Sequence, residues 1–349
     1  MSMVLAEESA METALDAALG GVRGANPLVG AVILDPQGRL LAVGHHRGAG
    51  TPHAEADALA QLEPGQAHGA TAVVTLEPCN HQGRMPACSH ALVEAGIGRV
   101  VYAVDDPDRR AAGGAEYLRS AGVEVQGGVL RPRAEELNRR WLRAVREQRP
   151  YTSLHLAQTL DGRIAAQDGT SQWISGPEAL EDNHALRSRV DAMLVGTGTV
   201  LADNPRLTAR IPGGALHPHQ PLRVVLGERE VSEDAAIRGD GAWLHLRHRD
   251  PVRAGKELHR QGVRHLMVEG GSQVTAAFLA ADAVDEITVA LAPTILGAGI
   301  PVIGDLGIRT LSDALSFDWD PAAGLTLKGR DLIFTLIPRD ARDDSSERR

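Results

Sequence analysis

Four residues in the first third of the chain have the types and spacing of a catalytic metal site. His53 and Glu55 stand two residues apart, and Cys79 and Cys88 follow them. Zinc binds imidazole nitrogen and thiolate sulfur tetrahedrally, and a catalytic zinc keeps its fourth position for water. His53, Cys79 and Cys88 supply three ligands, and bound zinc lowers the pKa of that water to about 7. Glu55 can then move a proton from the water to a departing amine.

The sequence around these residues narrows the chemistry. A His-x-Glu segment followed by Pro-Cys is typical of zinc deaminases that act on amino-pyrimidines or purines. Each residue alone would more often belong to a core, and the three together can also form a structural zinc site with a fourth ligand. Both cysteines of the chain fall in the pattern, which favours catalysis. The spacing of Cys79 and Cys88 is longer than that of the general pattern, which narrows the family.

The amino-acid composition argues against several other classes of protein. The 349 residues favour two domains, and 43% hydrophobic with 23% charged residues is ordinary for a globular chain. A net charge of −9 and only 3% aromatic residues argue against a general nucleic-acid binder. Two cysteines argue against a secreted disulfide scaffold. Without a signal-peptide pattern or an apolar run of about 18 residues, we expect a cytoplasmic protein with no membrane partner.

Alternating helices and strands predict an α/β layer in each half of the chain. In the first half we expect helices over 3–19, 53–61, 88–95, 117–121 and 135–146, and strands over 28–34, 40–44, 71–76, 99–104 and 123–125. In the second half we expect strands over 151–156, 192–195, 222–226, 263–268 and 286–291, and helices over 178–189 and 272–281. Pro150 disfavours helix at the residue before it, so the predicted domains are 1–147 and 148–338, with a flexible polar tail over 339–349.

Two segments of the first half carry a specific resemblance. Residues 26–30 read N-P-L-V-G, and residues 75–88 read T-L-E-P-C-N-H-Q-G-R-M-P-A-C. They resemble the bifunctional riboflavin biosynthesis enzymes, which join a diaminohydroxyphosphoribosylaminopyrimidine deaminase to a 5-amino-6-(5-phosphoribosylamino)uracil reductase. The resemblance implies a cytidine-deaminase-like three-layer sandwich, zinc on the three ligands above, and Glu55 as the proton shuttle. It also implies that Asn26, His81 and Arg84 line the pyrimidine site, although a turn at Asn26 and a solvated loop at 81–84 are the plain alternatives.

The second half has its own segments of interest, at 156–165, 171–175, 203–210 and 268–271. The last reads V-E-G-G, where an expected strand runs into two glycines before a helix. Glycine lets the backbone approach a ligand closely, and free N–H groups at a helix start bind phosphate. An ordinary turn is the alternative, as it is for the Gly-Thr-Gly-Thr segment at 196–199. The chain has no G-x-G-x-x-G fingerprint of a standard dinucleotide fold.

Taken together, these segments resemble the reductase half of the same family, which has a dihydrofolate-reductase-like fold and uses NADPH. The resemblance covers residues 1–338. It implies that the cofactor is contacted by Ala157, Trp173, Thr199, Asp203, Gly271, Ser272, Gln273, Val274 and Thr275. It implies that the substrate is contacted by Ser171, Arg187, Leu207, Arg210 and Glu269. Arginine suits a phosphorylated substrate because guanidinium binds phosphate through two hydrogen bonds.

The sequence departs from the family pattern at three places. His155 stands where the family commonly has a lysine that faces the reductase substrate. Gly227-Glu228 follows the strand expected over 222–226, where Asp-Ser is usual. A carboxylate at Glu228 would be unfavourable beside a cofactor phosphate. The loop over 106–110 is also shorter than in the family.

The resemblance implies two consecutive reactions on a phosphoribosylated pyrimidine, catalysed by a homo-oligomer with Zn²⁺ and NADPH. Zinc-dependent deamination of 2,5-diamino-6-(5-phosphoribosylamino)pyrimidin-4-one would precede reduction of its ribosyl group to a ribityl chain. The first alternative is a zinc deaminase of another amino-pyrimidine, a nucleoside or tRNA, with a non-catalytic reductase-like domain. A basic groove beside the zinc would favour it. The second is a binding protein without activity, which would bind NADPH and not turn it over.

Overall fold

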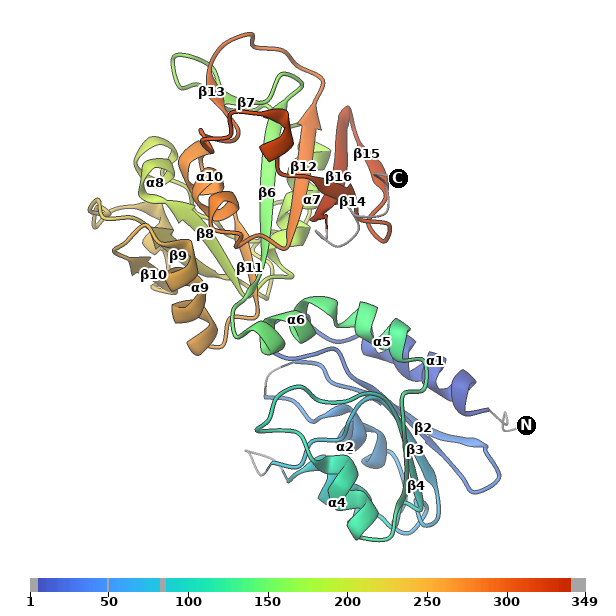
Figure 1. Ribbon diagram of the computed structural model, residues 1–349. Coiled ribbons are helices and arrows are strands. Elements are labelled where there is room, and N and C mark those ends of the chain that lie inside the picture. Colours follow the sequence, from blue (N-terminus) through green and yellow to red (C-terminus); the bar gives the residue numbers. More distant parts are fainter. Residues whose placement is uncertain (1–5, 49, 82–85, 340–349) are drawn as a thin grey trace, which may run out of the picture. The chain divides into compact units, whose positions relative to one another are not determined.

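The computed structural model of the protein describes residues 6–48, 50–81 and 86–339 (Figure 1). The chain forms two compact units: unit 1 ends at Gln148 and unit 2 begins at Arg149. The boundary expected from the sequence lies one residue earlier. Apart from Arg339, the tail expected over 339–349 lies outside the described residues. Among the described residues, no helix has both the length and the apolar character that a bilayer span requires.

Unit 1 is built on one five-stranded sheet in the order β2-β1-β3-β4-β5. Its strands are β1 (Gly30–Leu34), β2 (Leu40–His45), β3 (Thr71–Leu76), β4 (Arg99–Val104) and β5 (Glu124–Gly127). Its helices are α1 (Glu7–Ala18), α2 (Ala54–Leu59), α3 (Cys88–Glu94), α4 (Gly114–Ser120), α5 (Arg131–Leu137) and α6 (Arg139–Glu147). β1 runs antiparallel to both β2 and β3, and β3, β4 and β5 are parallel.

Helices cover both faces of this sheet because successive side chains of a buried strand point to opposite faces. In β1, Ala31 and Ile33 pack in a core with α2, α3 and α4. Val32 and Leu34 pack in a second core with α1, α5 and α6. Gly30, the glycine of N-P-L-V-G, lets β1 approach α1 closely, since a Cβ there would lie 1.9 Å from the Ala14 carbonyl oxygen. Unit 1 is therefore a three-layer α/β/α sandwich.

The prediction of one charged helix over 135–146 is wrong, because two helices, α5 and α6, cover this segment. Asn138 separates α5 from α6, with φ −109° and ψ 15°. Its buried side chain forms two hydrogen bonds with the backbone of Leu28: Oδ1 accepts from the N–H and Nδ2 donates to the carbonyl, each at 2.8 Å. Asparagine competes with helix formation through such side-chain bonds. The break thus ties the end of unit 1 to the segment that carries the N-P-L-V-G motif.

Unit 2 is built on a nine-stranded sheet in the order β10-β9-β8-β11-β6-β12-β16-β14, with β15 paired to β16. Its strands are β6 (Tyr151–Thr159), β8 (Ala192–Gly196), β9 (Leu222–Leu226), β10 (Trp243–Leu246), β11 (His265–Val268), β12 (Glu286–Ala292), β14 (Phe317–Trp319), β15 (Leu325–Lys328) and β16 (Asp331–Pro338). β7 (Arg163–Ala165) and β13 (Ile300–Pro301) form a separate ribbon. The helices are α7 (Pro177–Arg187), α8 (Thr197–Asp203), α9 (Pro251–Arg260) and α10 (Ser272–Ala280), with short 3-10 turns at Ala236–Arg238 and Leu311–Asp313.

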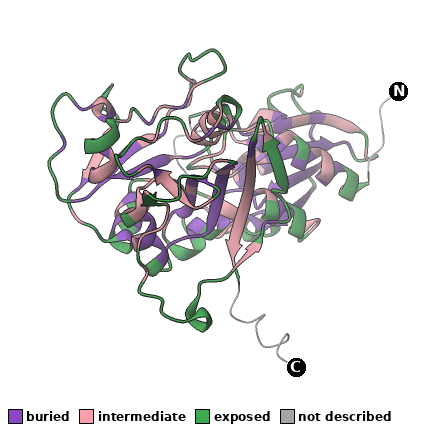
Figure 2. Ribbon diagram, turned by 90° about the horizontal axis from the view of Figure 1, so that it is seen from above, coloured by how far each residue is buried: buried purple, intermediate pink, exposed green. Residues whose placement is uncertain are grey.

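The strands from β10 to β12 are parallel, and both faces of this part of the sheet are covered. One core joins the sheet to α9 and α10, and the other joins it to α7 and α8. Figure 2 shows the central strands as buried and most connecting loops as exposed. In the sheet order, β9, β8 and β11 are neighbours, so their carboxyl ends meet at one edge. Open α/β sheets bind ligands outside the carboxyl ends of such strands.

Candidate active sites

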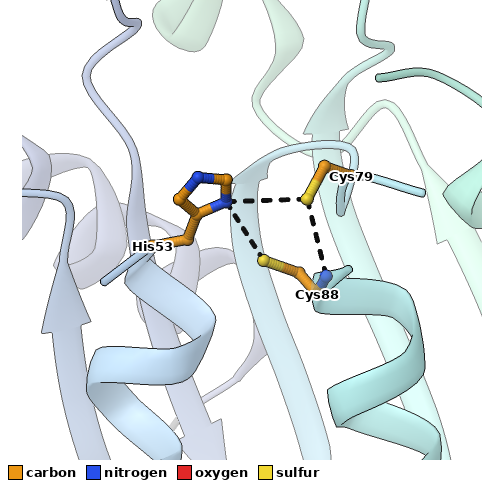
Figure 3. A group of neighbouring side chains, drawn as sticks. All are labelled: His53, Cys79 and Cys88. Atoms are coloured by element: carbon orange, nitrogen blue, oxygen red, sulfur yellow. Dashed lines mark hydrogen bonds between the residues drawn. The ribbon is translucent and has the colours of Figure 1, made fainter. Parts of the chain in front are cut away.

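The three expected metal ligands of unit 1 lie together, as Figure 3 shows. Cys79 follows β3, His53 directly precedes α2, and Cys88 is the first residue of α3. Nδ1 of His53 is 3.5 Å from Sγ of Cys79 and 3.3 Å from Sγ of Cys88. Zinc bonds of about 2.0–2.3 Å at tetrahedral angles separate their donor atoms by about 3.5 Å. The cluster is therefore suited to hold a zinc ion.

The two thiols differ in acidity. The pKa of Cys79 is lowered to about 4, first because Cys88 donates a hydrogen bond to its sulfur and then because of His53, which outweigh the opposing effect of burial. The pKa of Cys88 is raised, because it keeps the proton that it donates and because it is buried. The backbone N–H of Cys88 also donates to Sγ of Cys79, at 3.5 Å. This electron-rich, buried pair offers sulfur donors to a soft divalent cation.

Glu55 lies in the first turn of α2, next to this cluster, and is only 3% exposed. Burial raises its pKa to about 7, and the charge of Cys79 adds to the effect. A carboxyl group that gains and loses a proton near neutral pH is suited to general acid and base catalysis. Glu55 is therefore a candidate for the proton transfer expected from the sequence.

A second set of polar side chains lies beside the metal ligands. The ring of His46 is buried and packs edge-on against the ring of His53, with centroids 5.4 Å apart. Burial lowers the pKa of His46, which favours the neutral ring. Nδ1 of His46 lies 3.0 Å from the Pro52 carbonyl oxygen, which can only accept, so Nδ1 donates. Nε2 then accepts from Nδ2 of Asn26 at 3.1 Å, which fixes the orientation of the Asn26 amide.

His46 was not among the residues predicted from the sequence. It directly follows β2, next to His45, and no spacing rule connects it to Asn26, which is twenty positions earlier. The structure gives little support for the two loop residues expected to line the pyrimidine site. His81 is exposed, and Arg84 lies outside the described residues.

In unit 2, glycines allow the segments after β8 and β11 to approach each other. A Cβ on Gly196 or Gly270 would lie 2.7 or 2.6 Å from atoms of Val274 in α10. A Cβ on Gly271 would lie 3.4 Å from Oγ1 of Thr199. The structure thus brings together Thr199, Gly271 and Val274 among the expected cofactor residues. Glycine at 196 and 270 is therefore required by the close packing of both segments against Val274.

The remaining expected cofactor residues are more scattered. Ser272, Gln273 and Thr275 lie in the first turn of α10, with Gln273 exposed and Thr275 buried. Ala157 lies in β6, Asp203 is the exposed last residue of α8, and the side chain of Trp173 is 71% exposed. Among the described residues, no hydrogen bond joins Ala157 or Trp173 to Thr199 or Gly271, and none joins Asp203 to Gly271.

The expected substrate residues include a mostly buried ion pair. Arg187 at the end of α7 donates from Nε and Nη2 to the two carboxylate oxygens of Glu269, at 2.9 and 2.6 Å. Its Nη1 donates to the Thr208 carbonyl oxygen at 3.3 Å. Burial opposes the charge of Glu269, but the charge and hydrogen bonds of Arg187 outweigh it and lower the pKa of Glu269. The guanidinium group of Arg187 thus already forms hydrogen bonds within the protein.

Three other expected substrate residues have different surroundings. Arg210 donates from Nη1 to the Gly214 carbonyl oxygen at 2.6 Å, within a short loop. Leu207 is buried in the core beneath α7 and α8, and Ser171 is half-buried in the segment between β7 and α7. His155, which stands at the family's lysine position, is electrostatically coupled to Glu269 and Arg187, and burial lowers its pKa.

The fold and the cluster of His53, Cys79 and Cys88 fit a class of protein in which a zinc-type deaminase sandwich is joined to a second α/β domain. Residues 5–104 match the cytidine and deoxycytidylate deaminase zinc-binding region, and residues 150–323 match the RibD C-terminal domain. RibD of Mycobacterium tuberculosis is 43% identical over 318 residues, which cover 90% of this chain and 91% of the relative. RibD of Escherichia coli is 37% identical over 327 residues, covering 84% and 89%.

Solved structures agree with these matches. An Acinetobacter baumannii RibD structure aligns with a TM-score of 0.87 and 32% identity, covering 95% of this chain and 99% of that chain. A Thermotoga maritima diaminohydroxyphosphoribosylaminopyrimidine deaminase/5-amino-6-(5-phosphoribosylamino)uracil reductase aligns with a TM-score of 0.82 and 31% identity, covering 95% and 99%. The chain belongs to the RibD family of bifunctional riboflavin biosynthesis enzymes. The predicted fold class and the predicted pair of deaminase and reductase activities are confirmed.

Proposed function

We propose that unit 1 deaminates 2,5-diamino-6-(5-phosphoribosylamino)pyrimidin-4-one and that unit 2 then reduces the ribosyl group with NADPH. The deaminase would occupy residues 1–147 and the reductase residues 148–338. The observation that carries the proposal is the convergence of His53, Cys79 and Cys88, with donor atoms within 4.8 Å of one another, beside a buried glutamate.

In the deaminase, His53, Cys79 and Cys88 would hold zinc, which when bound activates a water as nucleophile near neutral pH. Asn26, held by His46, would orient the pyrimidine ring through its amide. Glu55 would take the proton of the attacking water and pass it to the amino group that leaves as ammonia. The ring carbon exchanges nitrogen for oxygen, and the product is the corresponding uracil.

In the reductase, NADPH supplies a hydride when bound. The glycines at 270 and 271 and Thr199 would line the cofactor site at the ends of β8 and β11. In this reduction the C1′–O4′ bond of the ribose would break, C1′ would gain the hydride and the former ring oxygen would gain a proton, so that the closed sugar becomes a ribityl chain. Arg210 would bind the substrate phosphate, because the hydrogen-bonding groups of Arg187 are directed to Glu269 and Thr208.

The experiment is to incubate the purified protein with the phosphoribosylated diaminopyrimidine, with and without NADPH, and to measure product masses. Replacement of the amine by oxygen without NADPH, followed by addition of two hydrogens with NADPH, is the expected result. Replacement alone in both tubes would contradict the reductase proposal. An unchanged substrate with zinc-loaded protein would contradict the substrate assignment and favour another amino-heterocycle.

A further inference from the structure

The loop that follows β9 carries three consecutive charged residues, Glu228, Arg229 and Glu230. The two carboxylates have arginine partners on the segment after β10. Glu228 lies 3.4 Å from Arg249, and Glu230 accepts two hydrogen bonds from Arg247, at 2.6 and 2.9 Å. Within residues 6–48, 50–81 and 86–339, no carboxylate lies within ion-pair distance of Arg229. The loop therefore keeps one positive charge uncompensated.

The guanidinium of Arg229 is directed to the beginning of α8. Its Nε lies 3.4 Å from Oγ1 of Thr197, and its Nη2 lies 2.9 Å from the position that a Cβ on Gly198 would occupy. Gly227 has φ +137°, and a Cβ there would lie 2.7 Å from Oγ1 of Thr197. Glycines at 198 and 227 are thus what allows the loop to lie so close to α8.

Arg229 contacts the beginning of α8, which also carries Thr199 of the proposed cofactor site. The inference rests on that proposed function. Thr199, one residue beyond Gly198, faces Gly271 at the end of β11. The glycines of the cofactor site lie at the ends of β8 and β11. In the strand order β9-β8-β11, Arg229 follows β9 and so lies one strand farther toward the sheet edge. Glycine turns suit the pyrophosphate of a dinucleotide, because they let the backbone come close to it. A positively charged side chain one strand farther toward the edge is then expected beside the adenosine end of the dinucleotide.

We infer that Arg229 binds the 2′-phosphate of NADPH and sets the preference for NADPH over NADH. A guanidinium offers a planar fork of donors that matches a phosphate, whereas NADH presents only a hydroxyl group at this position. From the sequence, we expect the carboxylate of Glu228 to be unfavourable beside a cofactor phosphate. The structure shows why this effect is weakened. The exposed carboxylate of Glu228 is paired with Arg249, so its charge is compensated and screened by solvent.

The test is the affinity of the Arg229→Gln variant for four ligands, measured by isothermal titration calorimetry without pyrimidine substrate. Loss of one charged contact is expected to weaken NADPH and 2′,5′-ADP by about 10- to 100-fold. NADH and 5′-AMP should stay within about two-fold. Arg260→Gln removes the same charge from an exposed residue in the last turn of α9, and should leave all four affinities unchanged. Circular dichroism checks that both variants are folded.

The outcomes separate this inference from the function on which it rests. Equal weakening of NADPH and NADH would overturn it, because Arg229 would then bind a group that both dinucleotides share. Unchanged NADPH affinity would overturn it as well. A wild-type protein that binds NADPH, together with either result, would leave the proposed reductase intact. A wild-type protein that binds neither dinucleotide would contradict both.

Discussion

Asn26 donates its amide hydrogen to Nε2 of His46, at 3.1 Å, while Nδ1 of the same ring faces the Pro52 carbonyl oxygen at 3.0 Å. The carbonyl fixes the tautomer of the ring, and the ring fixes the amide. We predict that His46→Phe, which keeps a ring beside His53, raises the deaminase KM by about ten-fold, the effect of losing one buried hydrogen bond. Zinc content measured by plasma mass spectrometry should stay the same.

A double-mutant cycle with Asn26→Ala shows whether His46 acts through Asn26. If it does, the double variant should be hardly worse than the worse single variant, because both changes remove the same interaction. Additive losses in kcat/KM, or zinc loss in His46→Phe, would show that the histidine acts in another way.

The ion pair of Arg187 and Glu269 should stabilise unit 2 in a pH-dependent manner. The pair is mostly buried, with side chains 16% and 14% exposed. Glu269→Gln leaves the guanidinium without its counter-charge, and we expect the free energy of unfolding at neutral pH to fall by about 3 kcal/mol. Denaturant unfolding followed by circular dichroism measures it.

The sign of the pH dependence follows from the lowered pKa of Glu269. Its folded pKa lies below the ordinary 4.5, so the stabilisation is complete above pH 4.5 and is lost as the pH falls through the folded value. The difference between wild type and Glu269→Gln should therefore narrow below pH 4.5. Glu230→Gln, from the exposed pair with Arg247, should show no measurable difference at any pH. A constant gap for Glu269→Gln would contradict this account.

Asn138 should stabilise unit 1 through its two hydrogen bonds with Leu28. Asn138→Ala leaves a buried N–H and a buried carbonyl without partners, and we expect a loss of about 2–4 kcal/mol in the free energy of unfolding. Asn138→Asp keeps the acceptor but faces the Leu28 carbonyl with a second oxygen, so it should not restore stability. Full stability of either variant would show that the break between α5 and α6 has another cause.

Local patterns in the sequence predicted much of this protein. The strands at 71–76, 99–104 and 222–226 have the predicted bounds, because continuous β-branched and apolar runs identify buried strands. The convergence of His53, Cys79 and Cys88 was predictable because metal ligands impose fixed residue types at the ends of neighbouring elements.

What the sequence did not reveal depends on contacts between distant positions. The bonds of Asn138 to Leu28 and of His46 to Asn26 leave no periodic signal in the chain. The same holds for Arg229, because the segment after β10 decides which of three adjacent charged residues have ion-pair partners. No helix was predicted at α8, because Gly-Thr-Gly-Thr at 196–199 favours a turn locally, whereas packing of Val200 into the core stabilises a helix.

The central claim is that one chain holds two separate sites, with Glu55 moving protons in the first. The most direct test supplies Glu55→Gln with each substrate in turn and measures zinc content and product masses. We predict that zinc is retained, that deamination falls by at least about 100-fold, and that the separately supplied deaminated compound is still reduced with NADPH. Retained deamination would remove Glu55 from the mechanism. Loss of both reactions in a folded, zinc-loaded protein would contradict the assignment of two separate sites.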